Sequence, residues 1–288
     1  MEEARGEHPS PEAASPPRAP APAPPAAATE LECFYERWAA RREGSPLEQD
    51  YESRAADWKW SHLERLIRAR ATTPASVLEF GCGSGEMLER AGAAFAGAAL
   101  SGIDLSERMV AMARLRLPRA HLTRGGVEAL EALAPAADLA LAVDILEHLE
   151  DPARAARALA RAARCVALKI PLERRLVRLG LRAQRPGPEH HVAGHLHFWT
   201  LGESRALLAR AGLEILGEFC ADPPESIRYH PATEATPREG GGPLELLRGA
   251  HHALEVGMER WTCARQPRLH RWMFGSSHFV LARGRGLG

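Results

Sequence analysis

From Pro74 onward, short apolar runs alternate with helix-length amphipathic segments, and this alternation restricts the fold more than any other feature of the sequence. Strands joined through helices form parallel βαβ units, and the final apolar run has no room for a helix after it. The alternation therefore predicts a doubly wound α/β domain with a mainly parallel seven-stranded sheet, whose last strand pairs antiparallel at or near an edge. We expect strands at residues 76–80, 98–103, 121–123, 138–143, 164–170 (ended by Pro171), 213–219 and 277–282. Helices are expected at 86–96, 106–117 and 152–163, and from the Thr200–Glu203 capping box to Gly212.

Composition divides the chain into three regions. Residues 1–30 are dominated by Pro and Ala and cannot bury an apolar face, which predicts a disordered leader. Residues 31–73 concentrate aromatic side chains at helical spacing and predict a pair of N-terminal helices, which either pack on the core or line a ligand pocket as a lid. Residues 74–288 hold the α/β domain, and the stretch 221–275 is expected to form a partly helical insert that caps the ligand site.

Charge balance and cysteine usage exclude several classes of protein. The chain has 37 basic and 37 acidic residues, which disfavours a nucleic-acid binder that neutralises phosphates. Charged residues interrupt the apolar runs and the N-terminal residues do not resemble a secretory signal, so neither a bilayer span nor export is expected. Five scattered cysteines without a C-x-x-C pair favour a cytoplasmic protein. Only Lys59 and Lys169 are lysines, which we interpret as a coding bias toward arginine.

A glycine-rich turn follows the first expected strand. Gly81, Gly83 and Gly85 alternate there, so a ligand can approach the backbone without meeting a Cβ, at the sheet edge where α/β proteins bind ligands. The spacing fits neither G-x-G-x-x-G nor a Walker loop, which disfavours a nicotinamide-dependent oxidoreductase and a phosphate cradle. Glu79, just before the turn, would repel a pyrophosphate but attract an ammonium group.

An acidic residue ends the second expected strand. Asp104 lies about 20 residues after the glycine turn, where a carboxylate accepts hydrogen bonds from ribose hydroxyls. Leu105 and Met109 are placed to flank an adenine ring. A ligand that combines adenosine with an amino-acid end is S-adenosylmethionine, which we therefore expect as the cofactor.

These motifs, in this order, resemble the class I S-adenosylmethionine-dependent methyltransferases, in particular the small-molecule branch that includes the ubiquinone- and menaquinone-biosynthesis enzymes. The resemblance extends from about Tyr51 to the end of the chain, and the residues that carry it are Glu79-x-Gly81-x-Gly83-x-Gly85, Gly102-Ile103-Asp104, the run from Asp138 to Pro152, and the run from Gly194 to Thr200. It implies a Rossmann-like methyltransferase fold. It also implies that the three glycines wrap the methionine part, Asp104 binds the ribose, and Asp144 and Ile145 lie beside the transferred methyl group.

One position departs from this family pattern. Many relatives carry an Asp after the third strand that reads the adenine amine, whereas here Gly125-Gly126-Val127-Glu128 stands in its place. Either the backbone of Val127 or the side chain of Glu128 must then serve, or adenine is held less specifically.

Histidines are the best candidates for removing a proton from a methyl acceptor near neutral pH. Those in the relevant half of the chain are His148, His190, His191, His195 and His197. The resemblance places His195 near the acceptor, which makes it the favoured base, with His148 second, although each could instead fix its loop. The loop from Pro188 to His197 has ligands that suit zinc, but no pair in it has the helical geometry of H-E-x-x-H, and a loop can scatter its side chains, so no metal is expected.

A basic amphipathic stretch at residues 172–182 follows the fifth expected strand. It predicts a membrane-surface helix, a dock for an acidic substrate or carrier protein, or a lid helix that packs its leucines inward.

Taken together, the sequence predicts a cytoplasmic, monomeric or weakly dimeric methyltransferase that modifies oxygen, nitrogen or carbon of a small-molecule acceptor. The alternative is a catalytically inactive methyltransferase-like regulatory or scaffold protein. A nucleic-acid methyltransferase is disfavoured by the charge balance and by the absence of an Asp/Asn-Pro-Pro-Tyr run after Val143.

Overall fold

The computed structural model describes residues 30–70, 73–133, 137–172, 194–228 and 276–284, with a few single positions between 254 and 269. All seven predicted strands are present, and their ends differ from the prediction by a residue or two. They are β1 (Ser76–Phe80), β2 (Ala99–Asp104), β3 (His121–Arg124), β4 (Ala137–Val143), β5 (Ala163–Leu172), β6 (Leu213–Ala221) and β7 (Ser276–Gly284).

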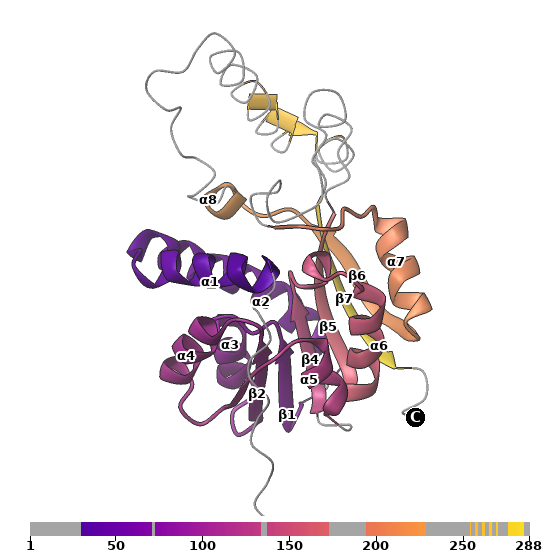
Figure 1. Cartoon of the computed structure of the whole chain (residues 1–288). Coiled ribbons are helices and arrows are strands. Elements are labelled where there is room, and N and C mark those ends of the chain that lie inside the picture. Colours follow the sequence, from indigo (N-terminus) through magenta and orange to yellow (C-terminus); the bar gives the residue numbers. More distant parts are fainter. Residues whose placement is uncertain are drawn as a thin grey trace, which may run out of the picture.

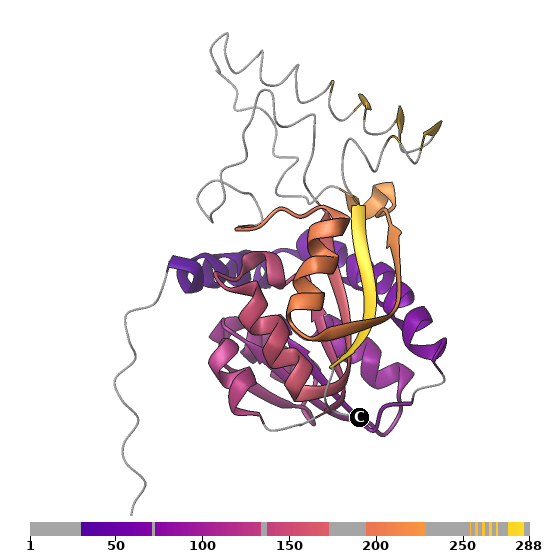
Figure 2. The same ribbon diagram turned by 90° about the vertical axis from the view of Figure 1, so that its right-hand side faces the viewer.

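The strands form one sheet in the order β3-β2-β1-β4-β5-β7-β6 (Figure 1). Strands β1 to β5 pair in parallel, whereas β7 pairs antiparallel with both β5 and β6. The mainly parallel sheet and the antiparallel last strand near an edge are therefore confirmed. Figure 2 shows β7 (yellow) beside the edge strand β6 (orange). Because the strand order reverses between β1 and β4, the loops that follow these two strands diverge and leave space for a ligand at their carboxyl ends.

The prediction that Pro171 ends the fifth strand is wrong. β5 continues to Leu172, and Pro171 is paired in register with Ser277 of β7. The pairing of β5 with β4 stops at Lys169, opposite Val143. Beyond that point β5 has a neighbour on one side only, and a proline without an N–H is tolerated on such an edge.

Helices cover both faces of the sheet. They are α1 (Glu30–Glu43), α2 (Pro46–Arg68), α3 (Glu86–Ala94), α4 (Glu107–Arg116), α5 (Val127–Ala132), α6 (Pro152–Ala162), α7 (Leu201–Arg210) and α8 (Glu225–Arg228), with a 3-10 turn η1 (Leu146–His148) after β4. Val77 of β1 belongs to the apolar cluster that includes α2, α3 and α4, while the adjacent Leu78 belongs to the cluster that includes α5, α6 and α7. This alternation explains why the central strands are apolar on both sides.

The two N-terminal helices pack differently: α2 packs on the core, as one interpretation of the aromatic region predicts, and the lid interpretation stays a prediction. α2 starts at the Ser45 cap, whose Oγ accepts from the Glu48 N–H, and it buries Trp60 and Leu63 against the sheet. α1 instead lies across the ligand edge, next to α4 (Figure 1). There Glu36 accepts a hydrogen bond from Ser106 Oγ at 2.8 Å.

Several sequence expectations lie outside the described residues. They are the leader up to residue 29, residues 173–182 of the basic stretch, His190, His191 and most of the insert at 221–275. Helix α5 was not predicted. None of the described helices is long and apolar enough to cross a membrane.

Candidate functional site

The glycine turn after β1 has a backbone that only glycine adopts without strain. Gly81, Gly83 and Gly85 have φ angles of +77°, +52° and +86°, in the left-handed region that a Cβ disfavours. A Cβ at Gly81 would lie 2.7 Å from Ile145 Cδ1, whereas at Gly83 the nearest atom beyond the adjacent residues would be Arg42 Nη1, 4.0 Å away. The turn is therefore tightly packed at its start and leaves room for a ligand at Gly83.

Asp104, the last residue of β2, holds this turn in place. Its Oδ2 accepts a hydrogen bond from the Gly83 N–H at 2.8 Å, and its Oδ1 accepts one from the Ser106 N–H at 2.9 Å. Leu105, the next residue, is half-buried. Met109 is only 4% exposed, so little of its side chain is accessible to an adenine ring.

Glu79 is buried, with 2% of its surface exposed. Its carboxyl group accepts a hydrogen bond from the backbone N–H of Leu88 in α3, and among the described residues its Oε2 has no partner. Burial, together with Glu86 and Asp104, raises the pKa of Glu79 well above its usual range. Glu79 thus connects β1 to α3 and retains one oxygen for a further donor.

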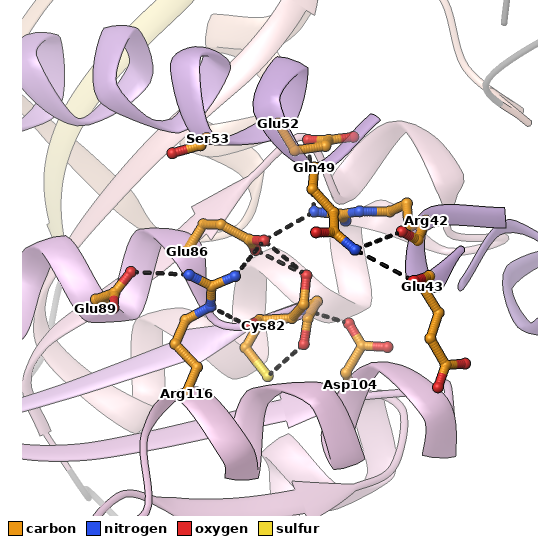
Figure 3. A network of polar contacts seen from close by, with 12 residues as sticks. Arg42, Glu43, Gln49, Glu52, Ser53, Cys82, Glu86, Glu89, Asp104 and Arg116 are labelled. Atoms are coloured by element: carbon orange, nitrogen blue, oxygen red, sulfur yellow. Dashed lines mark hydrogen bonds and ion pairs between the residues drawn. The ribbon is translucent and has the colours of Figure 1, made fainter. Parts of the chain in front are cut away.

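Helix α1 places an arginine over the glycine turn, which the sequence did not indicate. Arg42 is 7% exposed, and its Nη2 lies 3.0 Å from Glu86 Oε1. Arg116 of α4 reaches the same oxygen at 3.1 Å, and Ser84 Oγ donates to it at 2.8 Å, so these groups converge on Glu86 (Figure 3). Burial opposes ionisation of Glu86, but the two guanidinium groups hold its pKa below the usual value. Within the described part of the chain, Arg42 Nε has no partner and remains a donor beside the turn.

The two residues expected near adenine, Val127 and Glu128, differ in how far they are exposed. Val127 is half-buried at the start of α5. The Glu128 side chain is 73% exposed and pairs with Arg154 at 3.0 Å. Glu128 therefore faces solvent, and the backbone of Val127 or a less specific hold on adenine stays the prediction for this position.

Asp144, directly after β4, is held by two lysines. It is the only non-glycine residue with a positive φ, +52°, among those described. Its Oδ2 lies 3.0 Å from Lys59 Nζ of α2, and its Oδ1 accepts a hydrogen bond from Lys169 Nζ of β5. Burial alone would raise the pKa of Asp144, but the two ammonium groups hold it well below its usual range. Asp144 is therefore ionised at neutral pH.

The lysines that hold Asp144 are the only two in the chain. Coding bias therefore explains the scarcity of lysine but not where the two lysines are placed. The rarity of lysine could have marked Lys59 and Lys169 as candidate site residues, but the sequence does not show that both pair with Asp144.

Three further buried side chains meet next to Asp144, at η1. Glu147 and His148 belong to η1, and the Glu147 carbonyl accepts from the Leu196 N–H at 2.7 Å, which brings His195 to the same place. The Nε2 atoms of His148 and His195 each lie 3.9 Å from Glu147 Oε1. The sequence predicted both histidines as site residues, and the structure brings them together, with their rings 4.8 Å apart.

Glu147 was not predicted as a site residue. It is completely buried, and neither of its carboxylate oxygens has a hydrogen-bond partner within the described residues. Burial, assisted by the negative charge of Asp144, raises the pKa of Glu147 to about 8. The ring of Tyr35, from α1, lies edge-on against the His148 ring, with 5.6 Å between the ring centroids.

His197 has a structural role. Its Nε2 donates to the Leu149 carbonyl at 2.8 Å, and its ring stacks on Trp199. These contacts fix the loop that carries His195 and direct His197 away from the Glu147 carboxylate.

Comparisons with known proteins all indicate methyltransferases. A family model described as a methyltransferase domain matches residues 51–218. A stretch of 110 residues is 36% identical to trans-aconitate 2-methyltransferase from Methylobacterium nodulans, over 37% of this chain and 42% of that protein. The match thus spans less than half the length of that curated relative.

Two solved structures share the fold at low sequence identity. A Haloferax volcanii methyltransferase in complex with the Trm112 methyltransferase activator has a TM-score of 0.59 at 18% identity, covering 90% of this chain and 99% of that chain. Magnesium protoporphyrin IX methyltransferase from Synechocystis, with bound S-adenosylhomocysteine, has a TM-score of 0.55 at 16% identity, covering 88% of this chain and 98% of that chain.

The site agrees with this family. The room at Gly83, the carboxylate of Asp104 and the unpartnered Nε of Arg42 suit a ligand with an adenosyl part and an amino-acid end. The inactive-scaffold alternative gains no support from any of the comparisons. The chain belongs to the methyltransferase-domain family and is a class I S-adenosylmethionine-dependent methyltransferase.

Proposed function

We propose that this enzyme methylates an oxygen atom of a small, anionic acceptor held between the glycine turn and η1. The observation that carries the proposal is the charge next to η1. Lys59 and Lys169 place two ammonium groups around Asp144 at the switch point of the sheet, and Glu52 also acts on Lys59. An acceptor carboxylate or phenolate is attracted to that charge, whereas an ammonium group is repelled.

The cofactor contacts follow from the glycine turn. Gly81, Gly83 and Gly85 wrap the methionine part, and the Arg42 guanidinium, above Gly83, binds its carboxylate. The unpartnered Oε2 of Glu79 accepts from the cofactor ammonium.

The adenosine part extends along the ends of β2 and β3. Asp104 accepts hydrogen bonds from the ribose hydroxyls, and Leu105 and the Val127 backbone lie around the adenine, to which the buried Met109 offers little surface. When bound, S-adenosylmethionine supplies an electrophilic methyl group on a sulfonium.

The chain's own contribution to the chemistry is orientation and proton removal. Ile145 packs on Gly81, and Asp144 is locked by its lysines, so together they form a rigid wall where the methyl group is expected. The acceptor lies against His148 and His195. A carboxylate or phenolate attacks the methyl group as the anion, whereas an acceptor that binds as a neutral phenol first gives its proton to this pair, with His195 favoured over His148. The name of the relative with 36% identity, trans-aconitate 2-methyltransferase, is consistent with an organic acid as acceptor.

The proposal is tested by methyl transfer from labelled S-adenosylmethionine to three matched panels of small molecules: carboxylic acids, phenols and primary amines. Products identified by mass spectrometry should carry the methyl group on oxygen, and Lys59→Met should weaken KM for the best acid while binding S-adenosylhomocysteine normally. Exclusive methylation of amines or carbon, or an unchanged KM in Lys59→Met, would contradict it.

A further inference from the structure

We propose that Glu147, His148 and His195 form a binding site for one divalent transition-metal ion, of the zinc or manganese class. A position on this ion remains open for the acceptor oxygen, and this second part rests on the function proposed above.

The first support is the geometry of the three ligand atoms. One carboxylate oxygen and two imidazole nitrogens lie within 4.8 Å of one another, and both Nε2 atoms are 3.9 Å from the same oxygen, Glu147 Oε1. These separations are too long for hydrogen bonds. An ion about 2.1 Å from each ligand requires ligand atoms about 3.4 Å apart in tetrahedral geometry. The two 3.9 Å separations must therefore close by about 0.5 Å, and the widest separation by up to about 1.4 Å.

The second support is the carboxylate of Glu147. It is completely buried, and among the described residues both of its oxygens lack a hydrogen-bond partner. Buried polar groups are almost always satisfied, because an unsatisfied one carries the full cost of its lost hydration. A cation between Glu147 and the two imidazoles satisfies this carboxylate, whereas the neighbouring histidines are too distant to donate to it.

The third support is the way in which His148 is oriented. Its Nδ1 lies 3.4 Å from the Gly194 carbonyl, which can only accept, so Nδ1 carries the proton and Nε2 presents its lone pair toward Glu147. A backbone carbonyl on the remote nitrogen is the usual second contact of a metal-bound histidine. The same short loop carries His195 and is fixed through the Glu147 carbonyl, so the backbone holds all three ligands in place.

The ligand set indicates both the class of ion and its use. One carboxylate and two imidazoles, without thiolate, suit zinc, manganese, iron or cobalt, and sites with three protein ligands keep an open position. Asp144 is held by two lysines and takes no part. An acceptor hydroxyl on the open position would have a lowered pKa and would release its proton to water, without a protein base. With the ion bound, this route would replace the proton transfer to His195 proposed above, and His195 would act as a ligand.

The test is titration of the full chain, freed of metal with a chelator, with Co²⁺ alone as an optical probe. We expect one Co²⁺ per chain with visible absorption bands, which Zn²⁺ displaces. Affinity should fall more than about 100-fold in Glu147→Gln, a nearly isosteric change, and in His195→Gln. The exposed His121→Gln on β3 is the matched control and should bind as the parent does. Circular dichroism shows that each variant is folded.

Two results would overturn the metal site. Absence of stoichiometric Co²⁺ binding is one, and equal affinity in parent, Glu147→Gln and His195→Gln is the other, because the ion would then lie on other histidines. Calorimetry with S-adenosylhomocysteine on the metal-free chain separates the two proposals. Cofactor binding and methyl transfer without Co²⁺ binding would refute the metal site alone. Co²⁺ binding without methylation of any oxygen acceptor would refute the proposed function alone.

Discussion

Replacing Asp144 by Asn should destabilise the fold strongly, because it leaves two buried lysines without their shared carboxylate. Lys59 Nζ lies 3.0 Å from Asp144 Oδ2, and the Lys59 and Lys169 side chains are 21% and 10% exposed. At an effective dielectric constant of about 20, one such pair is worth roughly 5 kcal/mol before desolvation. Removal of one partner from a buried ion pair costs about 3–5 kcal/mol net, which is the loss that we expect.

The two lysines around Asp144 also predict that Lys59→Met changes the unfolding free energy in opposite directions in the parent and in Asp144→Asn. In the parent, Lys59→Met leaves the neutral Asp144–Lys169 pair and should cost about 1 kcal/mol. In the Asp144→Asn background, Lys59→Met removes one of two ammonium groups that repel each other, so it should restore stability. Urea unfolding followed by circular dichroism measures all four proteins.

The control is Asp50→Asn. It breaks an exposed pair between Asp50 and Arg54, whose side chains are 63% and 42% exposed, and should cost less than about 0.5 kcal/mol. The reasoning is refuted if Asp144→Asn costs no more than Asp50→Asn, or if Lys59→Met is equally destabilising in both backgrounds.

The remaining predictions concern the cofactor turn and the response to pH. Asp104→Ala should weaken S-adenosylhomocysteine binding by about 1–3 kcal/mol in calorimetry, since it removes charge-assisted hydrogen bonds; unchanged affinity would remove Asp104 from the pocket. Gly81→Ala should lower the melting temperature more than Gly97→Ala, because both have positive φ but only Gly81 faces Ile145 Cδ1 at 2.7 Å; equal losses would show that backbone strain alone matters. The difference in unfolding free energy between the parent and Asp144→Asn should narrow as pH falls below about 4. The pKa of Asp144 is lower in the folded chain than in the unfolded chain, so its ion pairs stabilise the fold fully above the unfolded pKa and progressively less as the pH falls toward the folded pKa. A constant difference down to pH 3 would contradict the ion pairs. Burial lowers the pKa of His278, so the neutral imidazole should stabilise the fold fully above about pH 6.5 and less below it, where the unfolded chain takes up the proton first. If unfolding is equally pH-dependent in His278→Gln, this prediction is contradicted.

The strands were predictable because strands buried on both faces are continuous apolar runs bounded by turn residues. Val77 and Leu78 pack on opposite faces, and both must be apolar. The glycine turn was predictable for a similar local reason, since three positive φ angles require three glycines. Pro171 shows the limit of such rules, because its tolerance depends on where β4 stops pairing with β5.

The rest of the candidate site depends on contacts between segments that are distant in the chain. Arg42 reaches the glycine turn only because α1 crosses the ligand edge, and helical periodicity does not show which edge a helix crosses. Glu147 and His195 meet through one backbone carbonyl, and Lys59 and Lys169 meet at Asp144 from opposite sides of the glycine turn in the sequence. No local pattern encodes these encounters.

The central claim is that the glycine turn binds an adenosyl amino acid. Its most direct test is titration calorimetry of the chain with S-adenosylhomocysteine and, in parallel, with NAD. The account predicts one S-adenosylhomocysteine per chain and no binding of NAD, with the S-adenosylhomocysteine affinity reduced in Arg42→Met, which removes the cation above Gly83. Binding of NAD alone, or of neither ligand to the folded chain, would contradict it.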